Sequence, residues 1–119
     1  MIFIICEKTL YTMIIILIYN NKEVIIMVDK NEIIKVAGWV LVSSYRNRVL
    51  IALGGKLKTP STLARESGIK INHISRVLKE LKEKKLVVCI NEEAHKGRLY
   101  KMTEFGQQVL QETKRIRDL

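Results

Sequence analysis

Cysteine is scarce in this sequence, and Cys6 and Cys89 are the two it contains. They lie far apart, and neither has a histidine at the spacing of a metal site, which excludes a disulfide framework and a zinc site. Cys89 alternates with Val87 in a short apolar run, so we expect a buried free thiol. No metal and no cofactor are therefore expected, and this cysteine usage fits a reducing cytoplasm.

Long hydrophobic runs are missing as well. The longest uninterrupted apolar stretch, Met13 to Tyr19, has seven residues, whereas a helix needs about 20 mainly apolar residues to cross a membrane. The sequence also lacks the basic start and the small-residue cleavage site of a secretory signal peptide. A membrane span is therefore marginal, and a membrane partner is not expected.

The residue patterns of a catalytic site are absent too. We find no nucleophile paired with a base, no glycine-rich loop that would cradle a phosphate, and no paired carboxylates on one face. Glu80 and Glu83 alternate with lysines, which is typical of ion pairing on a helix surface. His95 falls in a turn where its acidic neighbours offer no metal geometry. We therefore do not expect an enzyme.

Acidic residues are few compared with basic ones. The chain has 21 Lys and Arg against 12 Asp and Glu, a formal net charge of +9. On a domain of 119 residues, a surplus of this size favours a polyanionic partner, either nucleic acid or an anionic membrane surface. The placement of the charges has to decide between such a partner and a generally basic surface.

Residues 1–26 differ in composition from the rest: nine are Ile, and Gly, Ala, Pro, Arg, Ser, Asp and Gln are absent. Three interpretations are open. The residues are those of AT-rich codons, which fits a mis-assigned start with Met27 as the true one. The β-branched bias around the NNKE turn fits a native hairpin with strands near 12–19 and 24–28, and the apolar character fits a membrane anchor. Without this segment, 19 basic residues still face 10 acidic ones.

The central segment, Thr59 to Val88, predicts a helix, a tight turn, a second helix and a strand. Thr59 is an expected N-cap, with Pro60 at the first helical position. We expect Gly68 to end this helix in the left-handed conformation and Ile69 to enter the core. This order is that of a helix-turn-helix motif, whose second helix enters a DNA groove.

The second helix of this motif is expected from Ile71 to Lys84. At about 100° per residue its apolar side chains share one face, namely Ile74, Val77, Leu78 and Leu81. The opposite face is polar and carries Asn72, Ser75, Arg76, Lys79 and Glu83, with His73 and Glu80 on its flanks. Amide, hydroxyl and basic side chains are the groups that read base edges and bind phosphates.

Two segments precede this motif. Residues 29–42 are ambiguous, because Asp29 or Asn31 could cap a helix whereas the later GWVLV sequence favours a strand. A helix is expected over 43–53, beginning at one of two serines, Ser43 or Ser44.

Strands and one more helix complete the expected pattern. The short elements are a one-bridge strand at 56–58, strands at 86–91 and 97–102, and a turn at 92–96 between the latter two. Thr103 then caps a last helix over 104–117, where Gly106 permits close packing.

These residues resemble the winged helix-turn-helix transcriptional regulators of archaea and bacteria, nearest to the small archaeal members and the MarR- and ArsR-like groups. The motifs are a Leu-Ala-x-x-x-Gly-Ile turn, a Ser-Arg-x-Leu-x-x-Leu helix and a Gly-Arg-x-Tyr-x-x-Thr-x-x-Gly exit from the wing, over Ser43 to Gln111. The resemblance implies a mainly α fold with a small β-hairpin, a winged helix-turn-helix of the α+β class, over 29–117. It also implies a transcriptional regulator that binds double-stranded DNA.

The resemblance also assigns contacts residue by residue. It implies major-groove positions on the second helix, 71–84, for Asn72, His73, Ser75 and Arg76. It implies phosphate contacts for Lys70 and Lys79. The hairpin at 91–98 becomes the wing, and its contacts to the backbone or minor groove are Lys96 and Arg98.

The sequence departs from the family pattern in three respects. Lys70 stands where a capping Ser or Thr is usual, which moves the expected helix start and first contact to Asn72. Glu92 and Glu93 would repel phosphate, which restricts the wing contact to its Lys96–Arg98 side. The paired cysteines or histidine cluster of a metal-sensing ArsR-like protein are absent, which disfavours metal sensing.

Our leading hypothesis is a cytoplasmic, sequence-specific regulator that binds a pseudo-palindrome as a homodimer. The last helix together with 29–42 offers the expected dimer surface. One rival is a winged-helix module that binds proteins of the transcription or replication machinery, which would show an exposed apolar patch in place of a basic face. The other is a membrane-tethered regulator that uses residues 1–26.

Overall fold

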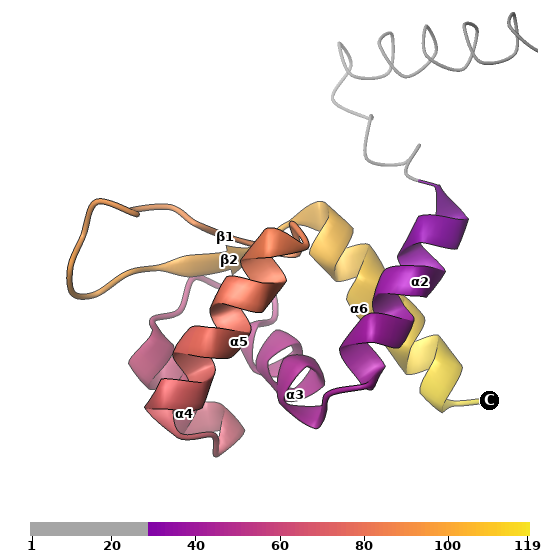
Figure 1. Cartoon of the computed structure of the whole chain (residues 1–119), viewed down its shortest axis with the longest axis horizontal. Helices are drawn as coiled ribbons and strands as arrows, with labels where there is room; N and C mark the ends of the chain where they lie inside the picture. Colours follow the sequence, from indigo (N-terminus) through magenta and orange to yellow (C-terminus); the bar gives the residue numbers. More distant parts are fainter. Residues whose placement is uncertain (1–28) are drawn as a thin grey trace, which may run out of the picture.

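The computed structural model describes residues 29–119, so the three interpretations of residues 1–26 lie outside the described residues. Within this range the chain is mainly helical with one small hairpin, as predicted (Figure 1). The elements are α2 (Lys30–Leu41), α3 (Ser44–Leu53), α4 (Pro60–Ser67), α5 (Ile71–Glu83), β1 (Val87–Cys89), β2 (Tyr100–Met102) and α6 (Glu104–Arg117). The helix-turn-helix is α4 and α5, and the wing is the loop between the two strands.

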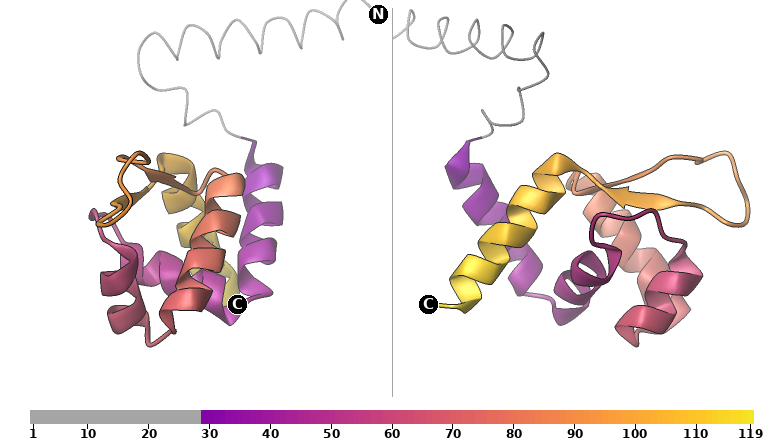
Figure 2. Two further views of the ribbon diagram at one scale, coloured as in Figure 1. Left: turned by 60° about the vertical axis from the view of Figure 1, so that its left-hand side comes forward. Right: turned by 180° about the vertical axis from the view of Figure 1, so that it is seen from behind.

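The ambiguous segment 29–42 is helical. The Asp29 carboxylate accepts a hydrogen bond from the Asn31 backbone N–H at 3.0 Å, which caps the first turn of α2. Val36, Ala37 and Val40 fall on one helical face and are buried, so packing overrides the strand preference of GWVLV. The face lies beside α6, and both views of the ribbon show the two helices adjacent (Figures 1 and 2).

The predicted caps of the other helices are confirmed. The hydroxyl oxygens of Ser43, Thr59 and Thr103 each accept a backbone N–H three residues ahead, at 3.4, 3.2 and 2.9 Å. Gly68 ends α4 with φ 73°, the left-handed conformation that the turn requires. Pro60 occupies the first position of α4, where its missing N–H has no helical partner to lose.

The core lies where α3, α4 and α5 meet α2, α6 and the hairpin. The predicted apolar face of α5 is buried throughout, at Ile74, Val77, Leu78 and Leu81. Ile69 enters the core from the turn, as expected. Gly106 lies against the chain just before β1, and a Cβ there would be 2.2 Å from the Leu86 carbonyl oxygen. The close packing predicted at this glycine is confirmed.

The hairpin strands are shorter than predicted. They pair only over 87–89 and 100–102, in antiparallel register from Val87 with Met102 to Cys89 with Tyr100. Beyond them the Ile90 N–H still donates to the Leu99 carbonyl at 3.0 Å, and the Asn91 Oδ1 takes the place of a backbone acceptor for the Leu99 N–H at 2.7 Å. The predicted one-bridge strand at 56–58 is confirmed, since Lys58 pairs with Tyr100 through two backbone hydrogen bonds of 3.1 and 2.9 Å.

Two further predictions need correction. Cys89 is half-buried rather than buried, and its Sγ lies 3.6 Å from Asn91 Oδ1. The helix α5 begins at Ile71 and not at Asn72, although Lys70 at the N-cap gives no side-chain hydrogen bond to its first turn. The extended backbone of Lys70, with ψ 145°, suffices to start the helix without a capping hydroxyl.

Candidate nucleic-acid interface

The outer face of α5 is polar and basic. Burial of its apolar face turns Asn72, Ser75, Arg76 and Lys79 to the surface, and all four are exposed. The Ser75 hydroxyl donates to the Ile71 carbonyl at 3.2 Å, so the serine keeps an acceptor lone pair free for an outside donor. The side chains predicted to contact DNA from this helix therefore share one accessible surface, and Lys70 is exposed at its N-terminal end.

His73 behaves differently from its neighbours on α5. It is half-buried, and its ring lies 5.5 Å from the Tyr45 ring of α3 at an interplanar angle of 53°. This tilted contact is a favourable arrangement of two aromatic rings. His73 thus joins α5 to α3, and only part of its ring is available to a partner.

The C-terminal half of α5 is held by Arg46 of α3. Its Nε lies 3.3 Å from the Glu80 carboxylate, and its Nη1 donates to the Trp39 carbonyl at 2.9 Å. The guanidinium also stacks on the Trp39 ring, with 3.9 Å from Cζ to the ring centroid. Glu80 therefore pairs with α3, which corrects the expectation that it pairs with lysines of its own helix.

Other cations near the motif are also engaged inside the protein. Arg48 donates to the Ser67 carbonyl at the end of α4, and its guanidinium lies 5.6 Å from the centroid of the Tyr45 ring. The Lys58 ammonium lies 2.8 Å from the Glu66 carboxylate, and this contact holds the pKa of Glu66 below its ordinary value. By contrast, within residues 29–119 neither Arg76 nor Lys79 makes an ion pair.

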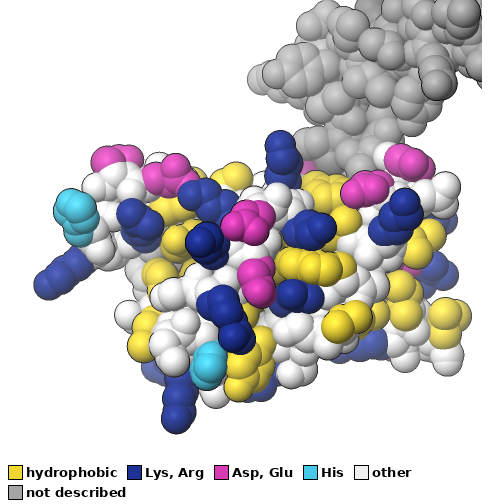
Figure 3. All heavy atoms as spheres, in the orientation of Figure 1, with side chains coloured by type: hydrophobic (Ala, Val, Ile, Leu, Met, Phe, Trp, Pro, Cys, Tyr) yellow, Lys and Arg dark blue, Asp and Glu magenta, His cyan; other side chains and the backbone are white. Residues whose placement is uncertain are grey.

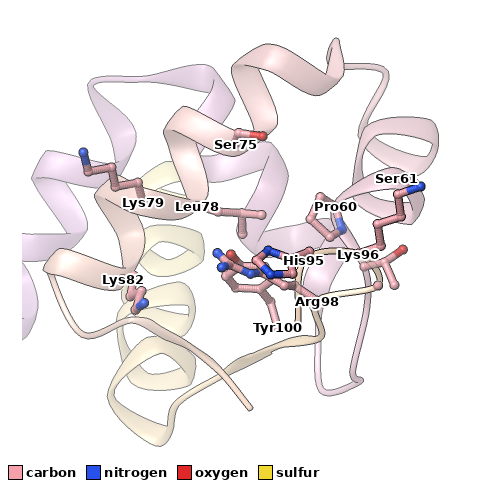
Figure 4. A pocket seen from close by; sticks show the side chains of 12 residues that line it. Pro60, Ser61, Ser75, Leu78, Lys79, Lys82, His95, Lys96, Arg98 and Tyr100 are labelled. Carbon is pink, nitrogen blue, oxygen red and sulfur yellow. The ribbon is translucent and has the colours of Figure 1, made fainter. Parts of the chain in front are cut away.

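A groove of about 780 Å³ separates α5 from the wing (Figure 4). Residues from α4, α5 and the wing line it: Thr59, Pro60, Ser61, Ser75, Leu78, Lys79, Lys82, His95, Lys96, Gly97, Arg98 and Tyr100. The groove brings together Ser75 and Lys79 of α5 with Lys96 and Arg98 of the wing. The Arg98 Nε donates to the Ala94 carbonyl at 2.7 Å, which holds its stem against the wing loop.

The charge distribution on this side is uneven. Lys and Arg side chains gather over α5 and along the wing (Figure 3). Glu92 and Glu93 lie on the wing, and Glu92 forms an ion pair with Lys82 of α5. Repulsion of phosphate was expected from both glutamates. It applies to Glu93, whereas the charge of Glu92 is neutralised by Lys82.

Metal sites and membrane-spanning helices were the last two features sought in the described residues. Within residues 29–119 no group of three or more Cys, His, Asp or Glu side chains is placed to hold a metal ion. No helix in the same range combines the length and apolar character required to cross a membrane.

Comparisons with solved structures identify the fold of the described residues. No model of a known protein family matches the chain, and no curated protein matches it by sequence. Among solved structures it is similar to the MarR family transcription regulator SP03579, with a TM-score of 0.57 and 20% identity over 71% of this chain. The fold is a MarR-like winged helix-turn-helix.

Two further structures share this fold. The chain is similar to ZitR of Lactococcus lactis, solved in complex with DNA, with a TM-score of 0.53 and 19% identity over 64% of this chain. It is also similar to RV1404 from Mycobacterium tuberculosis, with a TM-score of 0.58 and 16% identity over 85% of this chain. The matches span 58% of SP03579, 53% of ZitR and 69% of RV1404. The fold that the resemblance implied is confirmed.

The groove is also lined by residues that the sequence did not indicate. Lys82 lines the groove and lies three residues after Lys79, so helical spacing alone could have found it. Ser61 of α4 and His95 of the wing reach the same groove only because the fold brings distant segments together. Of the predicted residues, Asn72, His73 and Arg76 of α5 lie outside the groove lining, as does Lys70 before the helix.

Proposed function

We propose that this chain is a sequence-specific double-stranded DNA-binding transcriptional regulator and not an enzyme. In this proposal α5 enters the major groove, and the wing at 91–98 contacts the backbone or minor groove. One observation carries it: Arg76 and Lys79 face outward and make no ion pair within residues 29–119, whereas Arg46, Arg48 and Lys58 are engaged inside the protein. The outward polar surface also disfavours a protein-binding module that would use an apolar patch on α5.

The dimensions and chemistry of α5 suit a major groove. Its 13 residues give a length of about 20 Å, and a helix fits the groove width of about 12 Å. Asn72 and Arg76 lie four residues apart, hence on one face of the helix, near its N-terminal end. Asparagine and arginine form paired hydrogen bonds with adenine and guanine, respectively, so these two side chains are the proposed base readers.

The groove beside α5 suits a phosphodiester backbone. Lys79 borders it from the helix, and Lys96 and Arg98 border it from the wing. A strand passing between helix and wing would meet cations on both sides, and the hydroxyl of Ser61 adds a neutral hydrogen-bonding group. The similarity to ZitR, whose structure contains DNA, supports DNA binding by this fold.

Binding to labelled duplex DNA over a range of salt concentrations tests the proposal. Four cations proposed to contact phosphate (Lys70, Lys79, Lys96 and Arg98) would give a slope of log K against log salt of about −3 to −4 per protomer. Arg76→Ala and Lys79→Ala should each weaken binding. Lys101→Ala on β2 removes the same charge away from α5 and from the groove lining and serves as the control. Affinity that is flat in salt and unchanged by both interface variants would refute the proposal.

We further propose that the regulator acts as a homodimer in the cytoplasm. One α5 covers a short half-site, so two copies would read half-sites about 34 Å apart. The surface proposed for dimerisation is formed by α2 and α6, where Ile34 and Val42 expose 38% and 84% of their area. Light scattering on the full chain should give twice the monomer mass, and sequences selected from a random duplex pool should be pseudo-palindromic. A monomer mass or unrelated single sites would contradict dimer binding.

A further inference from the structure

An ion pair between Glu92 and Lys82 crosses from the wing to α5. The two side chains expose 54% and 46% of their area, so water and a partner can reach both. Lys82 also lines the groove between helix and wing. The pair therefore puts a carboxylate on a cation of the surface that we propose to face DNA.

The wing holds the backbone next to Glu92 in place. The Asn91 side chain spans the two arms of the loop, accepting from the Leu99 N–H at 2.7 Å and donating to the Gly97 carbonyl at 3.2 Å. The Ile90 N–H donates to the Leu99 carbonyl at 3.0 Å, and the Ala94 N–H donates to the Asn91 carbonyl at 3.0 Å. With its neighbours fixed in this way, Glu92 lies beside the last turn of α5.

Lys82 differs from the other cations of the groove. Within residues 29–119, Lys79, Lys96 and Arg98 make no ion pair with a carboxylate, whereas Lys82 makes one. Glu93, the adjacent acidic residue, is exposed and has no ion pair in the same range. Among these groove cations, only Lys82 has its charge neutralised by a carboxylate within residues 29–119, and of the two neighbouring glutamates Glu92 is its partner.

We propose that Glu92 competes with DNA phosphate for Lys82 and thereby lowers the sequence-independent part of DNA affinity. This inference rests on the DNA binding proposed above. A phosphate that approaches Lys82 has to displace the carboxylate, so the lysine contributes less counterion release than an unpaired one. Weaker non-specific binding leaves a larger share of the discrimination to the base contacts of α5.

Glu92→Gln removes the competitor and can be tested without knowledge of the operator. We would measure anisotropy of the full chain with a labelled mixed-sequence duplex of about 24 base pairs, from about 50 to about 300 mM salt. Glu92→Gln should tighten binding about two- to fivefold and steepen the salt slope by up to about 0.9, the value for one added phosphate contact. Glu93→Gln changes the same charge in the same loop and should have a smaller effect on both.

A double-mutant cycle with Lys82→Gln isolates the pair. In the Lys82→Gln background, Glu92→Gln should have no more effect than Glu93→Gln. The inference is overturned if the two glutamate variants act alike in the wild-type background, or if Glu92→Gln weakens binding because the pair merely orients the wing. If the wild-type chain binds no duplex DNA at any salt concentration, the proposed function itself fails.

Discussion

Gly106→Ala should destabilise the domain, although alanine is normally the better helix former. The new Cβ would lie 2.2 Å from the Leu86 carbonyl oxygen and 2.6 Å from Met102 Cγ. The carbonyl cannot easily retreat, because it accepts the Thr103 N–H at 2.9 Å and the Thr103 hydroxyl at 3.1 Å. Relief would require α6 to move by roughly 1 Å, since carbon contacts prefer about 3.5–4 Å.

The magnitudes decide the sign of this change. Overpacking of a core costs typically about 1–3 kcal/mol and occasionally more, and contact with a fixed backbone carbonyl belongs at the upper end. The gain from replacing a helical glycine is at most about 1 kcal/mol. Gly106→Ala should therefore lower the free energy of unfolding by about 2 kcal/mol or more, a large share of the about 5–15 kcal/mol of a typical domain.

Gly38→Ala provides the matched control in α2. Apart from its chain neighbours and the backbone of α2, a Cβ on Gly38 would meet no atom of residues 29–119 within 4 Å, so only the helix preference acts. This variant should raise the free energy of unfolding by about 0.5–1 kcal/mol. Urea unfolding of both variants, followed by circular dichroism, measures the difference. A Gly106→Ala protein as stable as the wild type would refute the close approach of α6 to Leu86.

Three further changes have defined outcomes. Arg46→Ala should lower the free energy of unfolding by about 1–3 kcal/mol, because Glu80 loses its partner; urea unfolding measures it, and an unchanged midpoint would contradict the bridging role. Asn91→Ala should speed amide hydrogen exchange at Leu99, and retained protection would show that the side chain does not hold the wing. Because Lys58 lowers the pKa of Glu66 from 4.5, that carboxylate stabilises the fold above pH 4.5 and less as pH falls through the folded value. Glu66→Gln should flatten this acid limb in pH-dependent unfolding, and an unaltered limb would contradict the pairing.

Local features of the fold were predictable from the sequence because they depend on neighbours in the chain. The caps at Ser43, Thr59 and Thr103 follow from hydroxyls placed before helical segments, and the buried face of α5 follows from apolar spacing. Gly68 and its left-handed turn follow from the lack of a Cβ. The order of these elements predicted a helix-turn-helix, and the resemblance to known regulators added the wing.

Contacts between distant segments were not predictable in the same way. The pairing of Arg46 with Glu80 joins residues 34 positions apart, and no spacing rule connects them. An ion pair between Glu80 and a lysine one turn away on α5 would stabilise the helix by only about 0.2–0.5 kcal/mol. A better-placed arginine on α3 can therefore take Glu80 as its partner instead. The early end of the strands likewise depends on the Asn91 side chain taking partners across the wing.

The division of the predicted contact residues between a groove and the outer face of α5 also needed the structure. The sequence assigned Lys79 to the helix and Lys96 and Arg98 to the wing, and the fold shows that all three border one groove. Arg76 lies apart from that groove, on the exposed face of α5. The two sets predict different effects on DNA: groove cations should act on every duplex alike, whereas Arg76 should act on a particular base pair.

Base preference in the Arg76→Ala variant tests the central claim most directly. After selection of a preferred duplex, competition binding would compare it with duplexes substituted at each position, for the wild type, Arg76→Ala and Lys79→Ala. We predict that Arg76→Ala loses about 1–3 kcal/mol of discrimination at one position, whereas Lys79→Ala weakens all duplexes about equally. An Arg76→Ala protein that keeps the wild-type preference at every position would contradict major-groove reading by this face of α5.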